Sequence, residues 1–212
     1  LNKKSISIDL KINESLEIFI KNITSKISNK RSLFNDWIKE LNLLKNKYPV
    51  YLKEYSKITN EGVNSYQFIQ VLSKKLEDDH IVVTYMGTSF TSTHQSLKTN
   101  GNNRLFTSSS CCSMGYGLPG GIGAYFAKKK SKIIVIAGDG GFQMNIQELQ
   151  TVVQYNIPIK IFILNNNGYL AIKLMQDNLF SGNYIGSNPE SGVSSPDFFK
   201  IAKAYGIKST RI

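Results

Sequence analysis

Apolar residues in the later two thirds of the chain fall into two alternating patterns. Three short runs are apolar at nearly every position, which is the pattern of strands buried on both faces of a sheet. Their β-branched residues support the strand prediction. The predicted strands are IVVT at 81–84, KIIVIA at 132–137 and IKIFIL at 159–164.

Around these runs, apolar residues return every three or four positions, which predicts helices with one buried face. Asn145 and Glu148 form a capping-box pattern, Pro196 suits a first helical position, and Gly206 suits a helix end. The predicted helices are SYQFIQVLSKKL at 65–76, GYGLPGGIGAYFAKK at 115–129, a segment from Asn145 to just before Pro158, and a segment opened by Ser195-Pro196 and packed through Phe198, Phe199, Ala202 and Tyr205.

Alternation of apolar strands with amphipathic helices predicts the fold class. It is an α/β fold: a doubly wound, mostly parallel sheet with helices on both faces. The part of the chain before this alternation carries separate features. In chain order they are a short alternating stretch SISIDL at 5–10, a helix within 12–27 with Asn13 as its candidate cap, a helix NDWIKELNLLKNK at 35–47 closed by Pro49, and an irregular polar connector from Tyr48 to Gly62.

Composition narrows the classes of function. The 212 residues are 41% hydrophobic, which is enough for a sizeable core. No apolar run reaches about 18 residues, so we expect no membrane span, and the start lacks a signal-peptide pattern. The formal net charge is +11, but it is spread as single lysines apart from the run 128–130. That distribution favours a solvated surface over a nucleic-acid interface.

The two cysteines, Cys111 and Cys112, are neighbours in the sequence. Adjacent cysteines rarely form a disulfide, because the bond strains the peptide between them. No Cys/His spacing indicates zinc. We therefore expect reduced thiols in a cytoplasmic protein.

Candidate chemistry lies where two predicted strands end. The strand 132–137 runs into Gly138, Asp139, Gly140 and Gly141, and the strand 159–164 runs into NNNG at 165–168. In doubly wound sheets, ligands bind beyond the carboxyl ends of the strands. If the two strands are neighbours, Asp139 and Asn166 lie close together.

A carboxylate, an amide oxygen and a free backbone carbonyl form an oxygen-only site, which suits Mg²⁺ that shares its shell with phosphates. Glycines beside Asp139 allow backbone N–H groups to approach a phosphate closely. A helix beginning near Asn145 adds a positive dipole end. We interpret the segment as a cradle for Mg²⁺ and a diphosphate, although GDGG or NNxG alone is most often just a turn.

The chain resembles the thiamine diphosphate-dependent enzymes, and acetolactate synthases in particular. GDG followed by NN, with Asp139 and Asn166 27 residues apart, resembles the signature of that family. TSSSCCSMGYGLPGGIGA resembles their TMGFGLPAAIGA segment, and GDGGFQMNIQELQTVVQYNIPIKIFILNNNGYLAI resembles their diphosphate-binding segment. The resemblance covers essentially the whole chain.

The resemblance implies a domain organisation. Residues 1–28 correspond to the end of a central domain, 29–63 to a helix and linker, and 64–212 to the diphosphate-binding domain. Because the chain begins with Leu1 and stops at Ile212 after an apparent strand, we expect a fragment or a processed chain, with the end of that domain truncated.

The resemblance also implies site residues. Asp139 and Asn166 would ligate Mg²⁺ through their side chains, and Gly168 through its backbone carbonyl. Met114 would lie beneath the thiazolium ring, and the carbonyl of Cys112 would accept from the 4′-amino group of the cofactor. The remaining predicted cofactor contacts are Gly87, Thr88, Ser89, Gly138, Gly140, Gly141, Phe142, Asn166, Tyr169 and Leu170.

The implied activity is decarboxylation of a 2-oxo acid such as pyruvate and transfer of the acyl unit to a carbonyl acceptor. The implied cofactors are thiamine diphosphate and Mg²⁺, with FAD an open question for the full-length protein. The catalytic glutamate of the family lies in a pyrimidine-binding domain that a second subunit contributes, so no catalytic acid or base is assigned to this chain. We expect a homodimer or homotetramer, and no turnover by this chain alone.

Departures from the resemblance leave alternatives open. Acetolactate synthases show GQHQ where this chain has GTSF at 87–90, Gly-Gly-Leu-Gly where it has residues 109–112, and RQWQ where it has KLMQ at 173–176. A 2-oxo acid decarboxylase that releases an aldehyde is one alternative, and a Rossmann-like nucleotide-binding module is another. The intact set Asp139, Asn166 and Gly168 argues against a non-catalytic relic.

Overall fold

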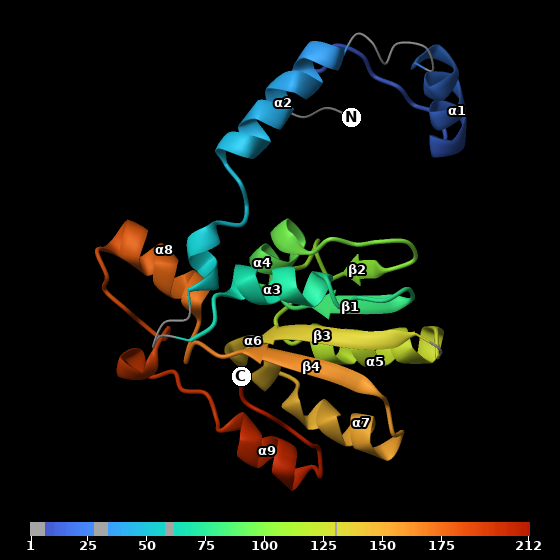
Figure 1. The fold of residues 1–212 in the computed structure, drawn as a ribbon. Helices are drawn as coiled ribbons and strands as arrows, with labels where there is room; N and C mark the ends of the chain where they lie inside the picture. Colours follow the sequence, from blue (N-terminus) through green and yellow to red (C-terminus); the bar gives the residue numbers. More distant parts are fainter. Residues whose placement is uncertain (1–6, 28–33, 58–61, 130) are drawn as a thin grey trace. The chain divides into compact units, whose positions relative to one another are not determined.

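The computed structural model describes residues 7–27, 34–57, 62–129 and 131–212. The chain divides into two compact units, residues 1–49 and 50–212. In the described residues, the first unit holds two helices, and the second holds the parallel sheet with the helices that cover it (Figure 1).

The first unit contains α1 (Leu16–Ile27) and α2 (Asn35–Lys47), and the bounds of α2 match the prediction at both ends. Neither helix has a buried residue. The predicted cap Asn13 is wrong, because Oγ of Ser15 accepts from the backbone N–H of Ile18 instead. The predicted alternating stretch lies partly outside the described residues, and residues 7–10 form no strand.

The second unit is built on four parallel strands in the order β2-β1-β3-β4. Three of them, β1 (His80–Thr84), β3 (Lys132–Gly138) and β4 (Ile159–Leu164), confirm the predicted strands to within one residue. The fourth, β2 (Arg104–Phe106), was not predicted, because three residues of mixed exposure carry no readable period.

The register places the carboxyl ends of the strands at one edge. Thr84 pairs with Ile136, and Gly138 pairs with Leu164. The segments after β3 and β4 therefore leave the sheet side by side, as the prediction required.

Alternate residues of the strands face two helical layers, which confirms the doubly wound class. Val82, Ile134 and Ile136 pack on the face covered by α3 and α4, while Val83, Val135 and Ala137 pack on the opposite face (Figure 1). The helices of the first face are α3 (Ser65–Ser73) and α4 (Thr88–Ser96), and those of the second are α5 (Gly117–Ala127), α6 (Asp139–Gln143), α7 (Leu149–Gln154) and α9 (Phe198–Ala204).

Two helix starts differ from the prediction. Asn145 makes no capping bond, because its Oδ1 accepts from Nε2 of Gln147 instead and the next turn is a short 3₁₀ helix, η3 (Ile146–Glu148). Its Nδ2 donates to the carbonyl of Gly115. The last helix begins at Phe198, and Asp197 caps it by accepting from the backbone N–H of Phe199. The remaining elements are η2 (Lys53–Ser56) within the expected connector, α8 (Leu170–Phe180) and η4 (Pro189–Ser191).

Candidate metal and diphosphate site

Asp139 is the first residue of α6, directly after β3, and its side chain is only 1% exposed. Oδ2 of Asp139 accepts a hydrogen bond from the backbone N–H of Gly168 at 3.0 Å. The same oxygen accepts from Oγ of Ser195 at 3.1 Å. The carboxylate is therefore fixed by two segments that are remote from it in sequence.

No cation compensates this buried carboxylate within the described residues. The ion pairs found there join Lys39 to Asp36, Lys128 to Asp79, and Lys132 to Glu77. An isolated buried carboxylate is costly unless it is paired or coordinates a metal. A bound cation would compensate this charge, and the Asp139 carboxylate would offer it an oxygen ligand, although no group of three or more His, Cys, Asp or Glu side chains in the described residues forms a metal cluster.

The loop after β4 presents the second predicted ligand. Oδ1 of Asn165 accepts from the backbone N–H of Asn167 at 3.1 Å, and Asn167 adopts a left-handed backbone with φ of 59°. This Asx turn leaves Asn166 exposed, and its side chain makes no hydrogen bond to the described part of the chain. Asn166 is therefore free to coordinate a ligand without disturbing the fold.

The glycines after Asp139 accommodate two aromatic rings. A Cβ on Gly140 would lie 2.3 Å from the ring of Tyr169, and a Cβ on Gly141 would lie 2.9 Å from the ring of Tyr85. Only glycine permits these contacts. The structure thus brings Tyr169 against the predicted diphosphate-binding backbone.

Three further predicted cofactor contacts differ in how far they are buried. The side chain of Phe142 is 2% exposed and packs edge-on against Phe198, with ring centroids 5.7 Å apart. Phe142 thus contributes to the core, and only its backbone could face a cofactor. Gly138 and Leu170 are half-buried at the ends of β3 and the start of α8.

The predicted second phosphate loop lies between β1 and α4, at the same edge of the sheet. Gly87 has φ of 85° and precedes the first residue of α4, Thr88. Ser89 is 1% exposed, and its Oγ donates to the carbonyl of Met86 at 3.3 Å. The Ser89 hydroxyl is directed into the protein, which leaves Thr88 as the half-buried hydroxyl of this loop.

The loop before α5 carries Cys112 and Met114. Cys112 has φ of 52°, and its backbone N–H donates to the carbonyl of Ser108 at 2.8 Å. Both cysteine thiols are free and exposed, and Met114 is 42% exposed. Nδ2 of Asn145 donates to the carbonyl of Gly115 at 3.0 Å, which ties this loop to the segment after α6.

Sequence reasoning missed Tyr85, which joins β1 to the start of α5. Its ring is fully buried, and its hydroxyl accepts from the backbone N–H of Leu118 at 2.8 Å. Burial raises the pKa of Tyr85 to about 12. A single tyrosine after a strand has no sequence signature, so only the fold reveals this role.

Ser187 and Ser195 were also missed. The carbonyl of Ser187 accepts from the backbone N–H of Tyr169 at 2.8 Å, and a Cβ on Gly168 would lie 2.4 Å from that carbonyl. The hydroxyl of Ser187 is buried and has no partner among the described residues.

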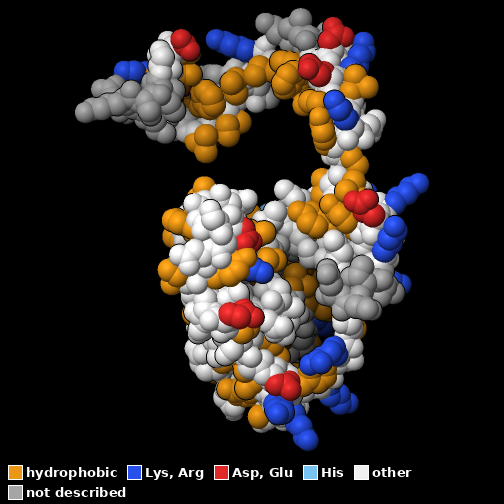
Figure 2. All heavy atoms as spheres, turned by 90° about the vertical axis from the view of Figure 1, so that its left-hand side faces the viewer, with side chains coloured by type: hydrophobic (Ala, Val, Ile, Leu, Met, Phe, Trp, Pro, Cys, Tyr) orange, Lys and Arg blue, Asp and Glu red, His pale blue; other side chains and the backbone are white. Residues whose placement is uncertain are grey.

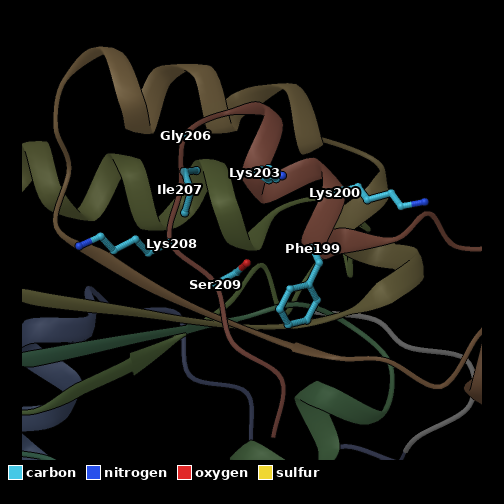
Figure 3. A pocket seen from close by; sticks show the side chains of 7 residues that line it. All are labelled: Phe199, Lys200, Lys203, Gly206, Ile207, Lys208 and Ser209. Carbon is cyan, nitrogen blue, oxygen red and sulfur yellow. The ribbon is translucent and has the colours of Figure 1, made fainter.

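Figure 2 views the edge of the sheet at which the strands end in Figure 1. On the sheet-bearing unit this face is largely backbone and uncharged polar side chains, with lysines and arginines mainly toward its lower and right-hand margins. A hollow elsewhere is lined by residues of α9 and the segment after it, and it contains none of the predicted site residues (Figure 3). Its lysines Lys200 and Lys208 point away from one another.

Residues 86–212 match the family described as thiamine pyrophosphate enzyme, C-terminal TPP binding domain. The chain therefore belongs to the thiamine pyrophosphate (thiamine diphosphate) enzymes. This family membership argues against the alternative prediction of a Rossmann-like nucleotide-binding module. It also agrees with the parallel sheet and the loops described above.

Among known proteins, the chain is similar to acetolactate synthase large subunits. The chain is 32% identical over 224 residues to a probable acetolactate synthase large subunit of Methanococcus aeolicus, covering 99% of this chain and 36% of that protein. It is 35% identical over 176 residues to the acetolactate synthase large subunit of Pyropia yezoensis, covering 83% and 28%. With the large subunit from Lactococcus lactis subsp. lactis it shares 29% identity over 209 residues, covering 99% and 35%. The chain thus spans about a third of these relatives.

None of the helices in the described residues is long and apolar enough to cross a membrane.

Proposed function

We propose that the chain forms the magnesium- and diphosphate-binding part of an acetolactate synthase-like carboligase. Such an enzyme decarboxylates a 2-oxo acid such as pyruvate and adds the acyl unit to a carbonyl acceptor. The observation that carries the proposal is Asp139: a buried carboxylate without a cationic partner in the described residues, held by Gly168 where β3 and β4 end together.

In this proposal Asp139, Asn166 and the carbonyl of Gly168 hold Mg²⁺, which is an oxygen-only set. Backbone N–H groups of Gly140 and Gly141 hold the diphosphate, as glycines permit close approach. Gly87, Thr88 and Ser89 form the opposite wall. Bound thiamine diphosphate supplies the carbanion chemistry, and the protein supplies binding and orientation.

The loop before α5 has a separate proposed role. Met114 is exposed enough to contact the thiazolium ring. The carbonyl of Cys112 would accept a hydrogen bond from the bound cofactor. The left-handed backbone of Cys112 and its bond to Ser108 fix the direction of that carbonyl. These contacts orient the cofactor rather than take part in proton transfer.

The wider assembly follows from the same proposal. Residues 1–28 belong to a central domain, 29–63 to a linker and 64–212 to the diphosphate-binding domain. A second subunit contributes a pyrimidine-binding domain, so the enzyme is a homodimer or larger, acts in the cytoplasm, and this chain alone has no turnover. Whether FAD is bound depends on the central domain.

A second candidate is a 2-oxo acid decarboxylase that releases an aldehyde. It is favoured by the sequence KLMQ at 173–176 on α8, where acetolactate synthases show RQWQ. The side chains of Leu174 and Met175 are about half exposed there. Helix α8 begins two residues after the proposed metal ligand Gly168. Side chains on α8 that differ from those of acetolactate synthases therefore fit a different acceptor substrate.

Product analysis separates the two candidates. The complete gene product, supplied with thiamine diphosphate, Mg²⁺ and pyruvate, is expected to yield acetolactate, identified by mass. Acetaldehyde alone would favour the decarboxylase. If pyruvate is not consumed while the cofactor is bound, the donor is a different 2-oxo acid.

A further inference from the structure

The two oxygens of Asp139 have different surroundings. Oδ2 accepts from the backbone N–H of Gly168 at 3.0 Å and from the hydroxyl of Ser195 at 3.1 Å. Within the described residues, Oδ1 receives no hydrogen bond. Because two donors already occupy Oδ2, Oδ1 is the oxygen that remains available to a metal.

Ser195 reaches Asp139 from a segment that is itself fixed, residues 187–195, here called the clasp segment. At its start the carbonyl of Ser187 accepts from the backbone N–H of Tyr169. In its middle, Oδ1 of Asn188 accepts from the backbone N–H of Ser191 at 3.0 Å, within a reciprocal capping box. The clasp segment therefore contacts both the loop after β4 and the carboxylate after β3.

The far end of the clasp segment is anchored as well. Asp197, two residues beyond Ser195, caps α9 through the backbone N–H of Phe199 at 2.9 Å. Phe198 of that helix packs against Phe142 of α6. Ser195 is thus held between an anchored helix and a capped turn, which limits the directions its hydroxyl can take.

We propose that Ser195 is a positioning residue for the proposed metal ligand Asp139, because its hydroxyl fixes the carboxylate and leaves Oδ1 free for a bound cation. This inference rests on the proposed function. A hydroxyl donor to a ligating carboxylate orients that ligand, and loss of such partners typically weakens metal binding about 10- to 100-fold. Gly168 alone would leave the carboxylate one hydrogen bond and more rotational freedom.

The test measures metal binding directly. Mn²⁺, used as a spectroscopic substitute for Mg²⁺, is titrated into the complete gene product with saturating thiamine diphosphate, and free Mn²⁺ is followed by electron paramagnetic resonance. Ser195→Ala is expected to weaken Mn²⁺ binding by about 10-fold or more. Ser195→Thr, which keeps the hydroxyl, is expected to restore most of the affinity.

Ser194 provides the matched control. It is the exposed neighbour of Ser195 and makes no hydrogen bond in the described part of the chain, so Ser194→Ala should bind Mn²⁺ like the wild type. Thermal unfolding without metal separates positioning from folding, because a purely structural role would lower stability and leave the affinity of the folded protein unchanged. If Ser195→Ala does not fold, Ser195→Cys keeps the volume with a weaker donor, and reduced affinity is still expected.

Two failures are distinguishable. If Asp139→Ala abolishes Mn²⁺ binding while Ser195→Ala binds as tightly as the wild type, the role of Ser195 is overturned and the proposed function stands. If Asp139→Ala also binds Mn²⁺ with unchanged affinity, the metal site itself is wrong.

Discussion

The backbone N–H of Gly168 donates to the carboxylate of Asp139 at 3.0 Å, although 29 residues separate them. This bond joins the segment after β3 to the segment after β4. It depends on the parallel register of the two strands, in which Gly138 pairs with Leu164. A change in either loop therefore alters the surroundings of the same carboxylate.

Asp139→Asn is expected to keep the fold while Asp139→Ala weakens it. The amide oxygen of Asn can still accept from Gly168 and Ser195, and the buried charge is removed. Ala leaves the donors without a partner, which costs about 1–3 kcal/mol for a buried group. Urea unfolding without metal measures both variants. Equal stability of Asn and Ala variants would contradict the hydrogen-bond assignment.

Asn166→Ala is expected to leave stability unchanged and to weaken Mg²⁺ binding. The side chain is exposed and forms no hydrogen bond with the described residues, so its removal should change the free energy of unfolding by no more than about 0.5 kcal/mol. Asn165→Ala is the matched comparison, because Asn165 forms the Asx turn. Calorimetric titration of Mg²⁺ checks the first variant, and unaltered affinity would exclude Asn166 as a ligand.

Tyr85→Phe is expected to destabilise the protein by about 1–3 kcal/mol, because the buried N–H of Leu118 loses its acceptor. Burial raises the pKa of Tyr85 to about 12 from the ordinary value of 10.0. The stability from the neutral phenol is therefore complete below pH 10 and is lost as the pH rises towards 12, since the unfolded chain ionises first.

Urea unfolding of the wild type and Tyr85→Phe at several pH values tests this linkage. The difference between their free energies of unfolding should be constant near neutral pH and should shrink above about pH 10. A difference that grows in that range would show that the phenolate is stabilised in the folded protein.

Gly117→Ala and Gly123→Ala, both on α5, are expected to act in opposite directions. A Cβ on Gly117 would lie 2.0 Å from the ring of Tyr85, whereas Gly123 has nothing within 4 Å. Overpacking at residue 117 should cost about 1–3 kcal/mol, and the exposed helical position 123 should gain roughly 0.5–1 kcal/mol. Thermal unfolding measures both; equal shifts would contradict the packing of Tyr85 against α5.

Bound cofactor is expected to slow alkylation of Cys112. Both cysteines are free and exposed, so a maleimide should modify them in the protein without cofactor. The carbonyl of Cys112 is proposed to contact the cofactor, which would restrict access to this loop. Mass spectrometry of the modified peptide, with and without thiamine diphosphate and Mg²⁺, gives the rates. Identical rates would place the cofactor away from the loop.

The sequence predicted those elements of the fold that depend on neighbouring residues alone. The segments that form β1, β3 and β4 are each apolar at nearly every position, and their order along the chain with intervening helices was enough to infer a parallel sheet. β2 is too short, at three residues, for any period. Asn145 and Glu148 matched a capping box, but Asn145 is used in a bond to Gly115, 30 residues away.

The candidate site shows the same division. The predicted proximity of Asp139 and Asn166 followed from their places after two neighbouring strands, and the structure joins the two segments through the backbone N–H of Gly168. Ser195 was read as part of a helix start, whereas its hydroxyl bonds to Asp139, 56 residues away. Such long-range partners depend on tertiary packing, which no local pattern encodes.

Binding of thiamine diphosphate with and without Mg²⁺, compared between the wild type and Asp139→Asn, tests the central claim most directly. The complete gene product is titrated with the cofactor, and tight binding is expected only for the wild type with Mg²⁺. Asp139→Asn should remain folded, yet bind the cofactor weakly whether or not Mg²⁺ is present. Mg²⁺-dependent binding of equal strength in both proteins would show that the charge of Asp139 does not belong to a metal.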